Sequence, residues 1–182
     1  MITISNKYLT LQSVTEEDAE FILELRTGQK GAFLNPTENN IQKQIDYIKK
    51  YKQKEANKEE YYFIIKLLDG EKIGTIRIYD IRGNSFCWGS WIIKEGTPSG
   101  YGGKSAFALY EFAFDYLGFE QSHFDVRKEN KIVINFHKKC GAEIVDENNL
   151  DCFFIFTKEQ YENARDNIYE KYHSPLDEVI IT

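Results

Sequence analysis

The stretch KEGTPSGYGGKSAFALYEFAFDYLGF, residues 94–119, decides the fold. Four glycines and a lysine lie within residues 96–104, and an apolar helical pattern runs from Gly103 to Leu117. Backbone N–H groups in such a loop can turn toward an anion, and the first turn of the following helix adds unpaired donors and the positive end of its dipole. Residues 96–105 therefore predict a phosphate-binding loop, with a plain turn before a helix as the alternative.

The composition is that of a single folded domain. The chain has 182 residues, of which 42% are hydrophobic and 15% aromatic, enough for one sizeable core. The net charge of −6 disfavours nucleic acid and anionic membranes as partners. The three cysteines are far apart and form neither a zinc nor a disulfide pattern, and no apolar run approaches the ~20 residues of a membrane span. We expect a soluble, cytoplasmic protein without a metal.

Hydrophobic periodicity divides the chain into strands and helices without a linker or a repeat. The predicted strands are 8–12, 61–68, 73–81, 86–94, 121–127, 142–146 and 150–157. The predicted helices are 16–26, 40–54, 103–117, 130–141 and a charged helix from residue 158. Short turns join the three strands between residues 61 and 94, so these strands form an antiparallel meander. The pattern predicts one α+β domain over residues 1–172, with residues 173–182 as a C-terminal tail.

Two motifs in this order of elements resemble the GNAT superfamily of N-acetyltransferases. Residues 97–102, TPSGYG, are similar to the family's Gln/Arg-x-x-Gly-x-Gly/Ala loop, with Thr97 in place of Gln or Arg. Residues 126–144 are similar to its N-x-x-A-x-x-x-Y-x-x-x-G-F helix, with His137 at the tyrosine position. The resemblance covers roughly residues 8–157. It implies a central mixed, largely antiparallel twisted sheet of about six or seven strands, flanked by helices and with a V-shaped splay between strands four and five.

The resemblance also implies acetyl-CoA as cosubstrate and direct attack of a primary amine on the thioester, without an acyl-enzyme. The residues that it places around the cosubstrate are Trp91, Ile92, Ile93, Ser99, Gly100, Tyr101, Gly102, Gly103, Lys104, Ser105, Asn130 and His137. His137 is the candidate general acid for the leaving thiolate, either as imidazolium or as a neutral N–H donor. A half-buried helix residue with a satisfied ring is the alternative.

The proton acceptor for the amine is less well defined by the sequence. Glu95 and Asp80 follow predicted strands and are candidate bases, although each is also explained as a surface carboxylate, and a water chain would serve as well. Cys140 lies one helical turn from His137, so a Cys–His pair is conceivable, but a core cysteine is the commoner situation. Homodimers are common in the family, and the charged C-terminal helix is the candidate interface.

For the acceptor pocket the resemblance points to the first two helices and their loop, together with the ring-rich meander. The candidate acceptor-binding residues are Arg26, Phe33, Asn35, Tyr79 and Trp88. Two GNAT branches fit, one that acetylates amino sugars linked to nucleotides and one that acetylates protein N-termini such as those of ribosomal proteins. We expect the amino-sugar branch. Polyamine or antibiotic acceptors, a non-catalytic acyl-CoA-binding domain and a protein-interaction module stay as alternatives.

Overall fold

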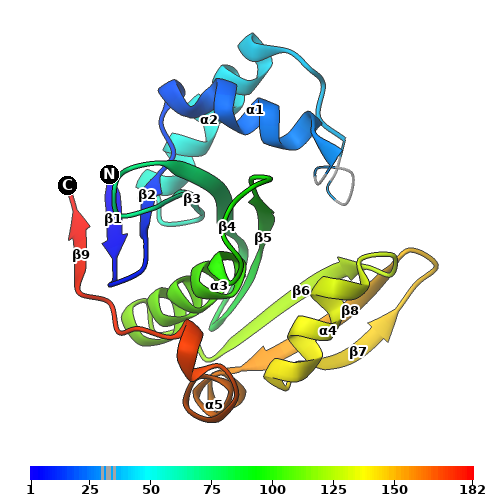
Figure 1. The fold of residues 1–182 in the computed structure, drawn as a ribbon. Coiled ribbons are helices and arrows are strands. Elements are labelled where there is room, and N and C mark those ends of the chain that lie inside the picture. The colour runs from blue at the N-terminus through cyan, green and yellow to red at the C-terminus, as the bar shows by residue number, and fades with distance from the viewer. Residues whose placement is uncertain (30, 32–33, 35) are drawn as a thin grey trace.

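The computed structural model describes residues 1–29, 31, 34 and 36–182. Within these residues, nine strands form one mixed sheet in the order β7-β8-β6-β5-β4-β3-β2-β1-β9, and helices cover both of its faces (Figure 1). The strands are β1 (Ile2–Ser5), β2 (Thr10–Ser13), β3 (Tyr61–Lys66), β4 (Lys72–Arg82), β5 (Ser85–Ile93), β6 (Gln121–Arg127), β7 (Glu143–Glu147), β8 (Asp151–Thr157) and β9 (Glu178–Ile181). The α+β class is confirmed.

Five α-helices and four short helical segments accompany the sheet in the described part of the chain. The α-helices are α1 (Ala19–Thr27), α2 (Ile41–Ala56), α3 (Tyr101–Glu111), α4 (Lys131–Cys140) and α5 (Lys158–Asn163). The short segments are η1 (Glu16–Asp18), η3 (Phe112–Tyr116), η4 (Ala164–Ile168) and η5 (Glu170–Tyr172). No helix among the described residues is both long and apolar enough to cross a membrane.

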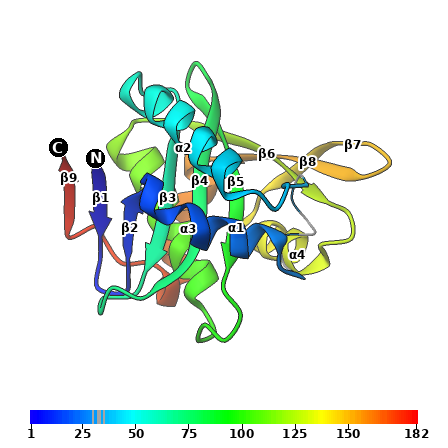
Figure 2. The same ribbon diagram turned by 90° about the horizontal axis from the view of Figure 1, so that it is seen from above.

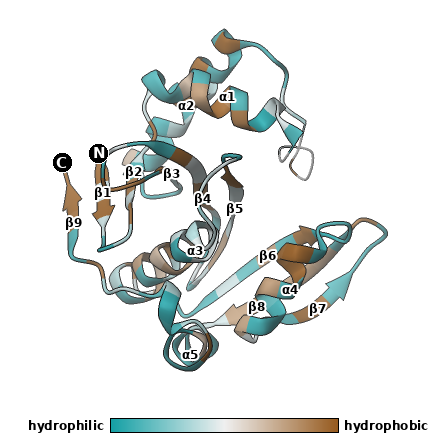
Figure 3. Ribbon diagram, in the orientation of Figure 1, coloured by the Kyte–Doolittle hydropathy of each residue, from teal (hydrophilic) through white to brown (hydrophobic). Residues whose placement is uncertain are grey.

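The C-terminus corrects the expectation of a tail over residues 173–182. Residues 178–181 form β9, which pairs antiparallel with β1 at the edge of the sheet. The registers Ile2↔Ile181 and Ile4↔Val179 join apolar residues, and Figure 3 shows both strands largely in brown. β1 itself was not predicted, and these two strands account for the difference between nine strands and the expected six or seven. Pairing with β1 supplies the ladder hydrogen bonds that a short apolar segment lacks by itself.

The sheet opens between β5 and β6, as predicted. These two strands run parallel but pair only at Ser85↔Gln121 and Phe86↔Ser122, after which they diverge (Figure 1). On its other side β6 pairs with β8 along its whole length. The β4–β5 register shifts between Thr75 and Arg77, and Ser90 in this bulge has a φ of 48°. A bulge bends its strand and increases the local twist, which helps to turn β5 away from β6.

Two layers of helices divide the rest of the molecule into two faces. α1 and α2 lie across one face over the N-terminal strands, as Figure 2 shows, and bury a cluster that includes Ile22, Ile48 and Tyr62. α3 covers the other face with a larger core that includes Phe107 and Phe114. Side chains alternate between the faces along each strand, so each strand that borders the opening contributes residues to both faces.

The C-terminal segment packs against α3 instead of continuing as one long helix. The helix expected from residue 158 is divided into α5, η4 and η5. An ideal Cβ on Gly103 would lie 2.6 Å from Cδ2 of Tyr172, so only glycine permits this close approach. His173 Nε2 lies 2.7 Å from Glu111 Oε2, and the hydroxyl of Tyr161 donates to the same oxygen at 2.6 Å. These contacts fix the C-terminal segment to α3.

Candidate active site

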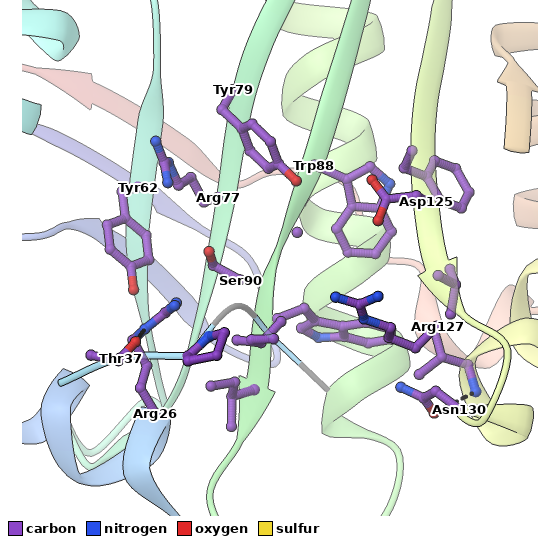
Figure 4. Close-up of a pocket in the computed structure, with 18 of the residues that line it drawn as sticks. Arg26, Thr37, Tyr62, Arg77, Tyr79, Trp88, Ser90, Asp125, Arg127 and Asn130 are labelled. Atoms are coloured by element: carbon purple, nitrogen blue, oxygen red, sulfur yellow. Dashed lines mark hydrogen bonds between the residues drawn. The ribbon is translucent and has the colours of Figure 1, made fainter. Parts of the chain in front are cut away.

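A cavity of about 850 Å³ lies where β5 and β6 separate. Residues from α1, α2, β3, β4, β5, β6 and α4 line it. Figure 4 shows Arg26, Tyr62, Arg77 and Tyr79 on one side, and Asp125, Arg127 and Asn130 on the other. The strand edges that border the opening have backbone groups without a ladder partner, because pairing between β5 and β6 ends after Phe86. The cavity is therefore lined by both an unpaired strand edge and polar, charged and aromatic side chains.

The alternation of strand side chains gives this cavity two chemically different walls. Trp88 and Phe124 face α3 and α4: Trp88 Nε1 donates to the Tyr110 hydroxyl at 2.9 Å, and the ring centroid of Phe124 lies 4.4 Å from that of His137. Arg77 faces α2, with its guanidinium carbon 5.7 Å from the Tyr47 ring centroid. One wall is therefore aromatic, and the wall on the α1–α2 side is polar.

Five of the residues expected around the cosubstrate line the cavity, namely Trp91, Ile92, Ile93, Asn130 and His137. Trp91 Nε1 donates to Ser105 Oγ at 3.2 Å, and its ring centroid lies 5.2 Å from that of Trp88. Asn130 is the N-cap of α4, because its Oδ1 accepts from the Val133 N–H at 3.3 Å. The structure thus brings residues from β5 and from the start of α4 to one opening.

The glycine loop adjoins the cavity without lining it, and its residues have separate roles. Gly100 is the N-cap of α3 with a φ of +94°, a conformation that favours glycine. The first N–H groups of α3, from Tyr101 onward, have no partner within the helix and can donate to an anion. A Cβ on Gly102 would lie 3.4 Å from Trp91 Cζ2, so Gly102 allows the helix to approach β5.

Two side chains of this loop differ from the expectation of phosphate contacts. Ser105 is fully buried, and its hydroxyl donates to the Gly102 carbonyl at 2.8 Å while it accepts from Trp91. The Lys104 ammonium lies over the rings of Tyr8 and Tyr101, 4.4 Å from each centroid. Ser99 is exposed in the turn before α3. The hydroxyl of Ser105 is therefore a structural group, and Lys104 in this conformation contacts tyrosine rings.

His137 is enclosed by aromatic rings. Only 2% of its surface is exposed, and Trp88, Phe124 and Phe136 lie within 5.5 Å of its ring centroid. Its Nδ1 has no hydrogen-bond partner among the described residues. Burial lowers the pKa of His137 to about 3, because the aromatic surroundings do not solvate the charged ring. Of the two expected forms of His137, burial therefore disfavours the imidazolium near neutral pH and favours the neutral N–H donor.

The burial of His137 predicts a measurable pH dependence of stability. Its pKa is about 3 in the folded chain and about 6.5 in an unfolded one. Between these two pKa values the unfolded state binds more protons than the folded state. The free energy of unfolding is therefore unaffected by the titration of His137 above pH ~6.5. It falls by about 1.4 kcal/mol for each pH unit below that value. We expect the wild type to lose about 2 kcal/mol more than His137→Phe between pH 7 and pH 5.

Urea unfolding of the two proteins at both pH values measures this difference. The other two histidines are present in both proteins, so their titration cancels in the comparison. An equal loss of unfolding free energy in wild type and His137→Phe would show that His137 takes up a proton in the folded state.

The candidate bases Glu95 and Asp80 do not line the cavity, and of the Cys–His pair only His137 does. Glu95 is exposed in the turn after β5 and is not among the residues that line the cavity. Asp80 is also outside the lining and pairs with Arg82 at 2.5 Å. Cys140 is buried, and burial raises its pKa to about 12, so its thiol is protonated. Asp125 is the carboxylate that sequence reasoning missed: it lines the cavity from β6, which only the splay of the strands could reveal.

The expected acceptor residues are only partly brought together. Arg26 and Tyr79 line the α1–α2 side of the cavity, and Arg26 Nε donates to Thr37 Oγ1 at 2.5 Å. Trp88 also lines the cavity, but it is 4% exposed and belongs to the aromatic wall. Phe33 and Asn35 lie outside the described residues. Arg77 was missed: its side chain is 16% exposed and pairs with Glu60, and its buried Nε has no hydrogen-bond partner among the described residues.

Comparison with known proteins agrees with this geometry. Residues 8–143 match the family model described as an acetyltransferase (GNAT) domain. The chain belongs to the GNAT family. A solved structure described as apo FdhC, a nucleotide-linked sugar GNAT, is 38% identical, covers 94% of this chain and 98% of its own, and superposes with a TM-score of 0.84. No curated protein sequence matches significantly.

More distant GNAT structures share the fold alone. Spermidine N-acetyltransferase from Vibrio cholerae, solved in complex with CoA and spermine, is 18% identical with a TM-score of 0.70, and covers 85% of this chain and 98% of its own. A proposed ribosomal-protein-serine acetyltransferase from Vibrio cholerae is 19% identical with a TM-score of 0.70, and covers 85% and 97%. As in its family, the chemistry of this GNAT domain is acetyl-CoA-dependent N-acetylation. No group of three or more His, Cys, Asp or Glu side chains suited to a metal occurs among the described residues.

Proposed function

We propose that this GNAT protein transfers an acetyl group from acetyl-CoA to the amine of a nucleotide-linked amino sugar. The cationic lining of the cavity is the observation that carries the proposal. Among the described lining residues, Arg26, Lys43, Arg77 and Arg127 are cationic, whereas Glu38 and Asp125 are the only carboxylates. In a protein with a net charge of −6, four of the six charged side chains that line this cavity are therefore cationic. Guanidinium groups suit the diphosphate of a nucleotide-linked sugar, because they bind phosphate oxygens in pairs.

The same lining disfavours the other two acceptor classes. A polyamine or a basic protein N-terminus carries positive charge, and like charges in a cavity are repelled. The 38% identical neighbour is described as a nucleotide-linked sugar GNAT, which supports the same acceptor class. The rings of Tyr47, Tyr62 and Tyr79 surround the Arg77 guanidinium at 5.0 to 5.8 Å, so aromatic faces are also present for a nucleotide base.

The residues of the splay fit a CoA thioester. The unpaired edges of β5 and β6 suit the amides of an extended pantetheine chain, and the start of α3 next to Trp91 offers N–H groups to its pyrophosphate. Thr75 Oγ1 donates to the Ser90 carbonyl at 2.7 Å, which holds the bulge in one conformation. The amine attacks the thioester carbonyl from the polar wall, and the thiolate leaves toward the aromatic wall. The neutral ring of His137 lines the cavity there and is the proposed hydrogen-bond donor to the thiolate.

A panel of amine acceptors tests the proposal. Acetyl-CoA is incubated with a nucleoside-diphosphate-linked amino sugar, with the same amino sugar free of nucleotide, with spermidine, and with a basic peptide. Thiol release gives the rate, and mass spectrometry identifies the acetylated product. We expect kcat/KM for the nucleotide-linked sugar to exceed that for each other acceptor by at least tenfold. A higher kcat/KM for spermidine or the peptide would contradict the proposed acceptor, and thioester binding without turnover would support a non-catalytic domain.

A further inference from the structure

We infer that Asp125 accepts the proton of the substrate ammonium, and so acts as the catalytic base of the reaction. The inference rests on the proposed amine acylation at this cavity and adds a residue role to it. Asp125 lies on β6, four positions beyond Gln121, where the strand begins and still meets β5. Its neighbour Phe124 packs on His137 at the aromatic wall. Alternation along β6 therefore directs Asp125 to the polar wall, on the side of the acceptor.

The position of the carboxylate suits a group that contacts substrate. Figure 4 shows Asp125 pointing from β6 toward the opening, while the Tyr79 hydroxyl points into the same opening from β4. On β5 between them stands Gly89, which leaves room because it has no side chain; an ideal Cβ there would lie 3.1 Å from the Tyr79 hydroxyl oxygen. An amine placed over Gly89 would therefore have a carboxylate on one side and a phenol on the other.

Asp125 is also free to bind an ammonium. The carboxylates Glu38, Asp80 and Asp151 each contact a cation in an ion pair. Asp125 has neither a hydrogen bond nor an ion pair to another side chain in the part of the chain that the structure describes. Asp125 is therefore a carboxylate without a side-chain partner in a cavity whose other charged residues are mostly cationic. Such a group is suited to pair with the ammonium of a substrate that is anionic elsewhere.

The electrostatic surroundings agree with this role. Asp125 is exposed at the cavity mouth. Partial desolvation nevertheless raises its pKa, and the negative charge of Asp151 raises it further. The positive charge of Arg127 acts in the opposite direction. A carboxylate with a raised pKa accepts a proton more readily. The other titratable groups that face it from neighbouring strands are the phenol of Tyr79 on β4, the thiol of Cys87 on β5 and, two residues back along β6, the imidazole of His123.

The proton balance of the step is simple. The carboxylate of Asp125 takes one proton from the ammonium, and the free amine forms a C–N bond to the thioester carbonyl. The tetrahedral intermediate collapses with cleavage of the C–S bond, and the thiolate leaves with the bonding electron pair. The nitrogen loses its second proton in this collapse, which balances the proton that the thiolate takes up. The proton on Asp125 returns to solvent through the cavity mouth, and the thiolate takes up a proton to give CoA thiol. No oxidant or further reactant is required.

The test compares Asp125→Asn, Asp125→Glu and wild type on whichever amine of the acceptor panel the wild type uses best. We expect Asp125→Asn to lower kcat at pH 7 by 10² to 10³, within the range for loss of a general base, with KM for acetyl-CoA unchanged. The ratio of wild-type to Asn kcat should shrink toward pH 9, where more of the amine arrives unprotonated. Asp125→Glu should recover part of the activity. Asp80→Asn, on the neighbouring exposed carboxylate, is the matched control and should behave as wild type.

The outcomes separate the two proposals. If wild type prefers an amine other than the nucleotide-linked sugar, the proposed acceptor fails, yet the comparison of variants still decides the role of Asp125. A kcat of Asp125→Asn within about threefold of wild type, a rise in KM for the amine alone, or a ratio independent of pH would each overturn that role. Acetyl-CoA binding measured by calorimetry verifies that the variants are folded. No turnover of any amine by wild type would overturn both proposals.

Discussion

Gly74→Ala is expected to lower the free energy of unfolding by about 3 kcal/mol, at the upper end of the usual cost of overpacking. Gly74 is buried in β4 beside the end of β5 that borders the cavity, and an ideal Cβ on it would lie 2.3 Å from the backbone oxygen of Ile92. A backbone atom in a paired strand cannot move aside as a flexible side chain can. β5 would have to shift where Ile92 and Ile93 line the cavity.

Thermal and urea unfolding measure this effect. For a chain of 182 residues, about 3 kcal/mol corresponds to a fall in Tm of roughly 6 to 12 °C. Gly89→Ala is the matched control, because the added Cβ would meet the hydroxyl of Tyr79 at 3.1 Å, and that side chain can move. Equal stability of Gly74→Ala and Gly89→Ala would contradict the close approach of β4 and β5 at Ile92.

Arg77→Met is expected to raise KM for the nucleotide-linked acceptor by 10- to 100-fold. The loss corresponds to one hydrogen bond to a charged group, about 1.5 to 3 kcal/mol. The guanidinium of Arg77 lies on the α1–α2 side of the cavity, where we propose that the acceptor binds, and its buried Nε has no hydrogen-bond partner among the described residues. Glu60 also pairs with Lys54, at 2.6 Å, so we expect the variant not to acquire an unpaired buried carboxylate.

Steady-state kinetics with both substrates checks this prediction. Arg82→Met serves as the control, since Arg82 lies on the same strand with 69% of its side chain exposed and is not among the cavity-lining residues. KM for acetyl-CoA should be unchanged in both variants. If Arg77→Met and Arg82→Met have the same KM for the nucleotide-linked acceptor, Arg77 does not bind the acceptor.

Local sequence patterns predicted the elements around the site well. The meander β3 to β5 and helix α4 begin and end within about two residues of the expected positions, because period-2 and period-3.6 patterns are set by neighbours in the sequence. The opening between β5 and β6 followed from the family resemblance and is confirmed by their short pairing. The tail was wrongly predicted because β9 depends on β1, at the opposite end of the chain.

The chemistry of individual side chains was harder to predict from the sequence. The rings that bury His137 come from β5, β6, β8 and α4, so its lowered pKa is a property of the folded chain. Gly103 appeared to belong to a phosphate loop, but it makes room for the ring of Tyr172, nearly seventy residues later. Asp125 and Arg77 read as ordinary charged residues in strands, and only the bulge and the splay place them at the cavity.

Tryptophan fluorescence tests the central claim, that the CoA thioester enters the opening between β5 and β6. The chain has two tryptophans, Trp88 and Trp91, and both line this cavity. We predict that titration with acetyl-CoA changes the emission saturably, with the same Kd as calorimetry gives, and that Trp91→Phe removes most of the change. Binding by calorimetry without any change in tryptophan emission would place the thioester elsewhere and contradict the account.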